Sequence, residues 1–172
     1  VLSLGMDQLY QFKPEEKIIE YTIAEEKKLL TMSIREFANE LSTDSPAPGG
    51  GSVAALSGAL GSSLSSMVAN LTYGKKGYEK AKGTIKKLAL NAQVLKDEFL
   101  DLIEKDTDVF NNVMDAFRLP KKTEEDNKKR SEALEKATKE ATLVPLEIMK
   151  KSVSLLKLAE HAEKKGNQNS VS

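Results

Sequence analysis

The sequence contains no cysteine and no tryptophan, and its one histidine is His161. Without cysteine, the chain can form no disulfide, no thiolate nucleophile and no zinc–thiolate site. With a single histidine, a Ser-His-Asp triad or a metal site of several imidazoles would have to depend on His161 alone. The chemistry open to the chain therefore rests mainly on carboxyl, hydroxyl, amide and amino groups.

The chain also lacks an excess of either charge, with 26 Lys and Arg residues against 26 Asp and Glu residues. A net charge of zero gives no sign of a nucleic-acid footprint or of a polybasic membrane surface. No signal-peptide pattern is present. We therefore expect a cytoplasmic protein that binds neither nucleic acid nor a membrane.

The sequence is rich in Ala, Leu, Lys and Glu, which favour helices, and no segment alternates as a β-strand does. Its 172 residues are enough for one domain with a core. We predict an all-α fold, a bundle of long antiparallel helices around a buried helix rich in Ala, Gly and Ser. Residues 1–31 are predicted to be a linker or tail of a preceding domain with one short helix, and residues 32–172 the helical domain.

Capping residues and apolar periodicity locate the predicted helices. A capping-box pattern at Ser33 and Glu36 begins a helix, which ends before the Pro- and Gly-rich stretch 43–52. Further helices are predicted over the ranges 52–73, 78–117 and 123–165. Pro145 lies inside the last of these and is expected to kink it.

The predicted helix over residues 52–73 carries no charge between Val53 and Leu71. Its length would allow a membrane span, but its many serines and Asn70 suit a protein interior better. A helix that is apolar on nearly all sides is buried at the centre of a structure. In a small domain this favours burial against a second subunit, so we expect a homo-oligomer, either a dimer or a larger assembly.

Asp106 is an acid on an apolar helix face. At about 100° per residue it lies level with Phe99, Ile103 and Phe110, whereas Asp108 falls on the solvent side. A carboxyl group on a core face is costly unless it is paired or protonated. Asp106 therefore either fixes the helix register through a Lys or hydroxyl partner, or serves as a general acid and base.

Two glycine-containing segments flank the uncharged helix. The glycines at 49–51 precede it, and the free N–H groups of a helix N-terminus bind anions or carbonyls; the alternative is a tight turn. The segment 72–78 ends the helix and contains Lys75, which either caps the helix or contacts a carboxylate ligand. His161 and the Lys- and Glu-rich run 121–139 are interpreted as solvated surface.

At these residues the sequence resembles the formiminotetrahydrofolate cyclodeaminase family. The matching segments are Ser45-Pro-Ala-Pro-Gly-Gly-Gly-Ser52, Met67-Val-Ala-Asn-Leu-Thr-Tyr-Gly74, Asp106 with Phe110, Arg118-Leu-Pro-Lys121, Val144-Pro-Leu146, and Gly166-Asn167 with Ser170. The resemblance covers residues 32–172, while residues 2–21 resemble the tail of a formiminotransferase domain and its linker. In the family the chain continues past Ser172, so we expect this domain to be incomplete at its C-terminus.

The resemblance implies an all-helical domain that dimerises, with folate sites at subunit boundaries. It implies conversion of 5-formiminotetrahydrofolate to 5,10-methenyltetrahydrofolate and ammonia in histidine breakdown, with Asp106 as the catalytic acid. A polyglutamylated tetrahydrofolate substrate, no further cofactor, no metal, and a formiminotransferase domain in the same parent chain are expected. The residues expected to bind folate are Pro48, Gly49, Gly50, Gly51, Ser52 and Lys75.

Two alternatives stay open at this point. A methenyltetrahydrofolate cyclohydrolase on the same fold would handle the same product, and release of ammonia from formiminofolate would separate the two enzymes. A non-catalytic helical dimerisation module is the alternative from another class. Such a module has no reason to bind folate, so folate binding would separate it from both enzymes.

Overall fold

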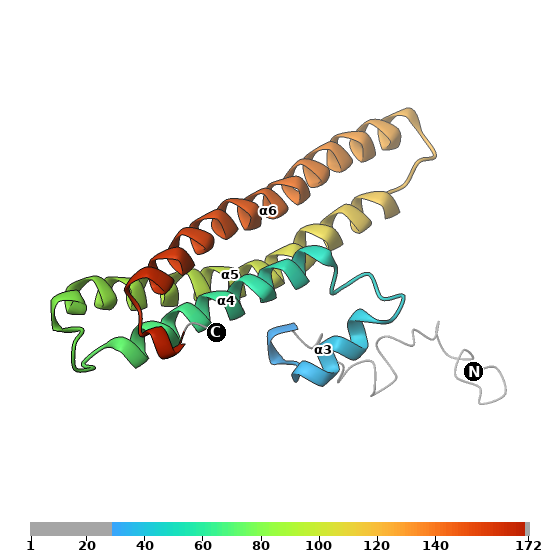
Figure 1. Ribbon diagram of the computed structural model, residues 1–172. Helices are drawn as coiled ribbons and strands as arrows, with labels where there is room; N and C mark the ends of the chain where they lie inside the picture. The colour runs from blue at the N-terminus through green and yellow to red at the C-terminus, as the bar shows by residue number, and fades with distance from the viewer. Residues whose placement is uncertain (1–28, 171–172) are drawn as a thin grey trace.

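The computed structural model describes residues 29–170 (Figure 1). The short helix expected in the N-terminal tail lies outside the described residues and stays a prediction. Over the described range the regular elements are all helical, as predicted. In chain order they are η2 (Leu29–Thr31), α3 (Ile34–Leu41), α4 (Gly50–Thr72), η3 (Glu79–Ala81), α5 (Lys82–Arg118), α6 (Glu124–Lys165) and η4 (Gln168–Ser170).

Two helices begin with capping boxes. At α3, the N–H of Glu36 donates to Ser33 Oγ over 3.2 Å, and the N–H of Ser33 donates to Glu36 Oε2 over 2.8 Å. At α6, Thr123 and Asp126 exchange the equivalent bonds at 3.0 and 3.1 Å. These reciprocal bonds satisfy N–H groups that a helix start would otherwise leave free, and the first box was predicted from sequence.

The long helices α5 and α6 form a hairpin, and α4 packs against both of them (Figure 1). Phe99 and Ile103 of α5 meet Val144 and Ile148 of α6 in the main core cluster. α6 runs through Pro145 to Lys165 as one element, so the predicted kink does not divide it. The bundle of long helices is therefore confirmed.

α4 turns small residues toward the core and large ones away from it. All nine of its buried residues are Ala, Gly, Ser or Thr. Gly58 has no room for a side chain, because a Cβ there would lie 2.6 Å from the ring of Phe99. By length and composition α4 could cross a membrane, but its small-residue face packs on α5 and α6 as a core helix does.

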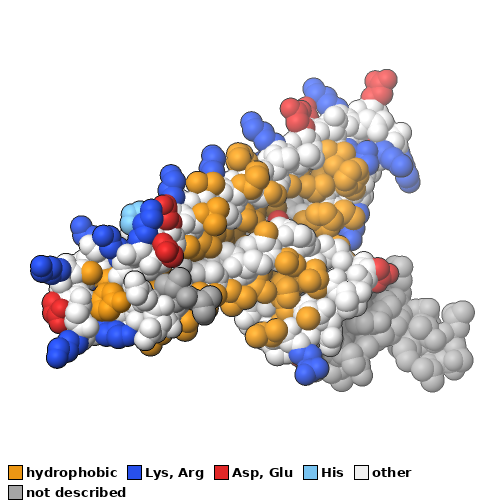
Figure 2. All heavy atoms as spheres, in the orientation of Figure 1, with side chains coloured by type: hydrophobic (Ala, Val, Ile, Leu, Met, Phe, Trp, Pro, Cys, Tyr) orange, Lys and Arg blue, Asp and Glu red, His pale blue; other side chains and the backbone are white. Residues whose placement is uncertain are grey.

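The outer face of α4 is apolar and exposed. Leu60 and Leu64 are each 57% exposed, and Met67 and Leu71 are exposed beside them. The prediction that this Ala/Gly/Ser-rich helix is buried thus holds for its small-residue face. Within one chain, its other face is not covered. Figure 2 shows adjoining groups of hydrophobic side chains on the surface of the helical body, and patches of this kind mark interaction surfaces.

Beyond Asp106 the apolar face of α5 is only partly buried: Val109 packs against the core and Ala116 is buried, whereas two phenylalanines are exposed. Phe110 is 41% exposed and Phe117 is 54% exposed, although both continue the apolar face that buries Phe99. The reason is tertiary: α4 begins at Gly50, opposite Asp106, so the rest of α5 extends past the end of α4 (Figure 1). Helical phase alone does not reveal where the covering helix begins.

The far end of α4 is closed by the segment after α6. The backbone N–H of Asn167 donates to the buried Thr72 hydroxyl over 2.8 Å. Lys75 Nζ donates to Asn167 Oδ1 over 2.7 Å. Gly166 is in tight contact here, since a Cβ on it would lie 2.6 Å from Val68 Cγ1. These contacts hold the C-terminal turn against the end of α4.

Candidate active site

Asp106 lies against the N-terminus of α4. The hydroxyl of Ser52, which is fully buried, donates to Asp106 Oδ2 over 3.0 Å. The same hydroxyl lies 3.5 Å from the Ile103 carbonyl oxygen. Because the start of a helix carries partial positive charge, it favours a carboxylate in this position. Ser52 thus positions Asp106, and the prediction that it binds folate stays a prediction.

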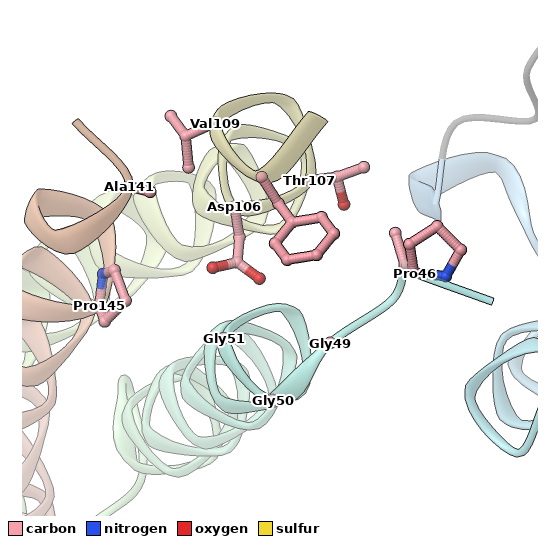
Figure 3. Close-up of a pocket in the computed structure, with 11 residues that line it drawn as sticks. Pro46, Gly49, Gly50, Gly51, Asp106, Thr107, Val109, Ala141 and Pro145 are labelled. Carbon is pink, nitrogen blue, oxygen red and sulfur yellow. The ribbon is translucent and has the colours of Figure 1, made fainter. Parts of the chain in front are cut away.

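Gly51 is the position where the backbone approaches Asp106 most tightly. A Cβ on Gly51 would overlap one carboxyl oxygen and lie 2.6 Å from the other, Oδ2. Figure 3 shows the carboxyl group of Asp106 directed at this turn of α4. Glycine is therefore required for contact between helix and carboxyl group.

A cavity of about 300 Å³ opens beside this contact. Asp106 and Thr107 supply its polar side chains, and the other side chains that line it are apolar. Three elements and one loop build the wall: α4, α5, α6 and the stretch before α4 (Figure 3). The residues concerned are Pro46, Ala47, Gly49, Gly50, Gly51, Asp106, Thr107, Val109, Phe110, Ala141 and Pro145.

Gly49 and Gly50 face open space at the cavity. A Cβ added to either residue would have no neighbouring atom within 4 Å. Among the described residues positive φ is found at Gly74 and Gly77 and not at these glycines. The reason is that Gly50 already belongs to α4, whose backbone is right-handed. Pro48 is buried and does not line the cavity.

A second cavity of about 480 Å³ shares Pro46, Ala47 and Thr107 with the first. Its wall includes the carboxyl-bearing residues Glu40, Glu104 and Asp108. Glu104 Oε1 accepts a hydrogen bond from the N–H of Leu30 over 2.9 Å. The two cavities thus adjoin at the segment Pro46–Ala47, with Thr107 in the wall of both.

The hydroxyl of Thr107 is buried and has no hydrogen-bond partner within residues 29–170. Ser62 Oγ, in the middle of α4, is the other buried hydroxyl without a partner in this range. By contrast, Ser57, Ser63 and Thr72 each donate to the carbonyl four residues earlier. For Thr107 that carbonyl belongs to Ile103, which the Ser52 hydroxyl already approaches. An unsatisfied buried hydroxyl is costly and is uncommon in folded proteins.

Lys75 lies at the opposite end of α4 from Asp106. The 23 residues of α4 separate the two ends, a distance of about 34 Å at 1.5 Å per residue. Lys75 and Asp106 therefore do not lie together within one chain. The role of Lys75 in binding a ligand stays a prediction.

The site joins one carboxyl group, free backbone N–H groups at a helix start, and an apolar cavity. That combination can move a proton and hold a polar ligand in a fixed orientation. Within the described residues no group of three or more His, Asp or Glu side chains could hold a metal ion. The prediction that no metal takes part remains a prediction.

Sequence reasoning missed several lining residues. Phe110 could have been found from its helical phase with Asp106. Pro46 and Ala47 belong to the matched loop but carry no reactive group of their own. Ala141 and Pro145 of α6 gave no signal, because only the packing of α6 against α5 brings them to the cavity.

The fold and the site together define a helical domain that places a carboxyl group at the N-terminus of a core helix. Residues 33–172 match the family described as Formiminotransferase-cyclodeaminase. The chain belongs to this family.

Among its relatives, Formimidoyltransferase-cyclodeaminase of Sus scrofa is 38% identical over 158 residues, which is 90% of this chain and 29% of the pig protein. Methenyltetrahydrofolate cyclohydrolase of Methylorubrum extorquens is 39% identical over 140 residues, covering 81% of this chain and 67% of that protein. The chain thus spans under a third of the length of the pig relative.

The fold is also similar to the crystal structure of formiminotetrahydrofolate cyclodeaminase from Thermotoga maritima. The TM-score is 0.71 at 30% sequence identity, with 83% of this chain and 67% of that chain covered. The predicted family and the predicted all-α fold are therefore both confirmed. The relatives carry two different enzyme names, so the family alone does not define one reaction.

Proposed function

We propose that this domain is a formiminotetrahydrofolate cyclodeaminase, which converts 5-formiminotetrahydrofolate to 5,10-methenyltetrahydrofolate and ammonia. The observation that carries the proposal is the Asp106 carboxyl group, held by Ser52 and packed on Gly51 beside a cavity. A cyclisation of this kind needs one group that both accepts and returns a proton. It also needs a rigid site that holds two nitrogen atoms close to one carbon.

The proton transfers can be written with Asp106 alone. N10 of the folate attacks the carbon of the protonated formimino group on N5 (N5–CH=NH2+), and a carbon–nitrogen bond forms as the N10 proton passes to the Asp106 carboxylate. The tetrahedral adduct then takes that proton on its amino group. The bond to this nitrogen breaks, ammonia leaves, and the remaining carbon bridges N5 and N10 as a cationic methenyl group.

The surroundings of Asp106 suit both the ring closure and the loss of ammonia. The Ser52 hydroxyl and the close contact with Gly51 hold the carboxylate that accepts the proton in one orientation beside the cavity. The same negative charge then stabilises the cationic methenyl product. The rest of the cavity wall is largely apolar, so few other polar side chains there compete with this interaction.

The rival reaction is hydrolysis of methenyltetrahydrofolate, the activity named for the Methylorubrum relative. The deciding experiment supplies 5-formiminotetrahydrofolate and measures ammonia and methenyltetrahydrofolate together. A cyclodeaminase releases the two in equal amounts. A cyclohydrolase forms neither from this substrate but hydrolyses added methenyltetrahydrofolate, and a dimerisation module does neither and does not bind folate.

A second copy of the chain is the proposed cover for the outer face of α4. The apolar stripe of α4 comprises the exposed Leu60, Leu64, Met67 and Leu71 together with Val53 and Leu56, which are partly buried against the core; as a whole it is centred at roughly residue 62. Antiparallel packing of two such stripes about that centre would oppose the two helix dipoles favourably. It would also set the Lys75 of one copy beside Gly49 of the other, since 49 and 75 are equally distant from 62.

This arrangement gives the proposed folate site the cation that it lacks within one chain. None of the residues that line the two cavities is a Lys or Arg, whereas folate carries carboxylates on its glutamate tail. A lysine from the second copy would bind that tail, and more strongly for a polyglutamylated folate. We further propose a cytoplasmic location, a role in histidine breakdown and a formiminotransferase domain in the same parent chain.

A further inference from the structure

Phe110 presents an aromatic ring to the cavity beside Asp106. It follows Asp106 by four residues on α5, so the two side chains share a helix face about one turn apart. Phe110 lines the 300 Å³ cavity and is 41% exposed. Among the described residues that line either cavity, it is the one aromatic side chain.

The exposure of Phe110 contrasts with Phe99 on the same helix. Phe99 is fully buried, and its ring packs directly on Gly58 of α4. Phe110 lies three turns further along α5, beyond the N-terminus of α4. Its ring therefore borders the cavity and is not covered by a helix. The rest of that wall is made mainly of Gly, Ala, Pro and Val, so the Phe110 ring is its one broad, flat surface.

Resting on the proposed function, we infer that Phe110 binds the folate substrate by stacking on one of its planar rings. The pterin and the p-aminobenzoyl ring both flank N5 and N10, the atoms that react. A ring held against Phe110 sets these nitrogens about one helical turn away, at the Asp106 carboxyl group. Aromatic stacking provides such placement without a directional hydrogen bond.

Stacking on a non-reacting ring holds the substrate and the transition state equally. Loss of the Phe110 ring therefore weakens binding and raises KM, while kcat changes little. Loss of a proton-transfer group has the opposite signature. The split between KM and kcat separates a binding role for Phe110 from any effect transmitted through Asp106.

The test compares Phe110→Leu, Phe110→Tyr and Phe117→Leu in the full-length protein. Phe117 is the matched control: it lies on the same helix, is 54% exposed, and its ring lies 5.7 Å from the Arg130 guanidinium, outside both cavities. Calorimetry with 5-formyltetrahydrofolate measures affinity, turnover of 5-formiminotetrahydrofolate measures KM and kcat, and light scattering measures the oligomer.

Phe110→Leu is expected to weaken 5-formyltetrahydrofolate binding about tenfold, with kcat within about threefold of wild type. Phe110→Tyr keeps the ring and is expected to bind like wild type, as is Phe117→Leu. Equal losses in the two leucine variants would overturn the inference. So would an affinity loss that accompanies dissociation of the oligomer, because Phe110 would then be a subunit contact.

Two further arms identify the ring and isolate the proposed function. Tetrahydropterin and p-aminobenzoylglutamate are titrated separately, and the stacked ring belongs to the fragment whose binding Phe110→Leu weakens. If neither fragment responds to Phe110→Leu, stacking is contradicted. Wild-type protein that binds no folate overturns the proposed function together with the inference, whereas folate binding unchanged by Phe110→Leu overturns the inference alone.

Discussion

The two ends of α4 carry similar local sequence features and have opposite character. Glycines flank both ends, and both lie beside polar groups. At the C-terminal end, Thr72, Lys75 and Asn167 bond to one another, and the chain closes over the helix. At the N-terminal end, Gly49 and Gly50 face open space, and Asp106 and Thr107 border a cavity.

The difference shows which end is built for stability and which for a ligand. Polar groups at the C-terminal end bond to one another within the chain and hold the C-terminal turn against α4. The N-terminal end keeps an open cavity, an unpartnered Thr107 hydroxyl and an exposed aromatic ring. Features that cost stability in the free protein are typical of functional sites.

The largest expected effect comes from removing the titrating group at the open end. Asp106→Asn keeps the shape of the side chain and should lower kcat about a hundredfold or more, the usual scale for a general acid and base. Folding and folate binding should be nearly intact. Asp108→Asn, on an exposed side chain of the same helix, is the control and should matter much less.

If Asp108 were essential and Asp106 dispensable, the assignment of the site would be wrong. If Asp106→Asn instead unfolded the protein and activity fell only in proportion, Asp106 would be a structural partner of Ser52. Circular dichroism melts of both variants separate these outcomes from a catalytic defect.

Gly51→Ala tests the close contact between α4 and the carboxyl group. The added Cβ overlaps the carboxyl oxygens, so Asp106 must move, and a displacement of about 1 Å can cost up to a hundredfold in rate. We expect kcat to fall about tenfold to a hundredfold while the helical signal is kept. Gly83→Ala is the control, because a Cβ added at Gly83 would have nothing within 4 Å. Equal activity in both variants would rule out a tight contact between Gly51 and Asp106.

Lys75→Gln tests whether the closed end of one chain completes the open end of another. Loss of a charge-assisted bond to the folate tail should raise KM about tenfold, with kcat kept. Lys76→Gln, beside it on the exposed surface, should leave KM unchanged. A KM effect of equal size in both would indicate only a general effect of charge.

Mixed dimers sharpen this test. A dimer of one Asp106→Asn chain with one Lys75→Gln chain has one fully intact site if Lys75 acts across the interface. Activity at low substrate should then approach half of the wild-type value. If both groups serve the same chain's site, neither site in the mixed dimer is intact, and activity stays low.

The smallest expected effect is a gain in stability at the open end. Thr107→Val replaces the unpartnered hydroxyl with a methyl group of similar size and should raise the Tm by about 2 °C or more. Thr107→Ser keeps the hydroxyl and should not stabilise the protein. A lower Tm in Thr107→Val than in wild type would mean that the hydroxyl has a partner.

Local signals predicted the helices and much of the site. The capping box of Ser33 and the uncharged run in α4 gave helix positions, and helical phase singled out Asp106. The predictions that failed depended on where one helix ends relative to another in the folded chain. Phase placed Phe110 in the core, but α4 stops before reaching it, and local sequence could not reveal that Lys75 and Asp106 lie at opposite ends of α4.

The location of bound folate tests the central claim most directly. A crystal structure of the full-length protein with 5-formyltetrahydrofolate should show the ligand in the cavity at the N-terminus of α4, within hydrogen-bond distance of Asp106 and against Gly49 and Gly50. Folate bound away from this cavity, for example in the hollow beside His161 between α5 and α6, would contradict the account.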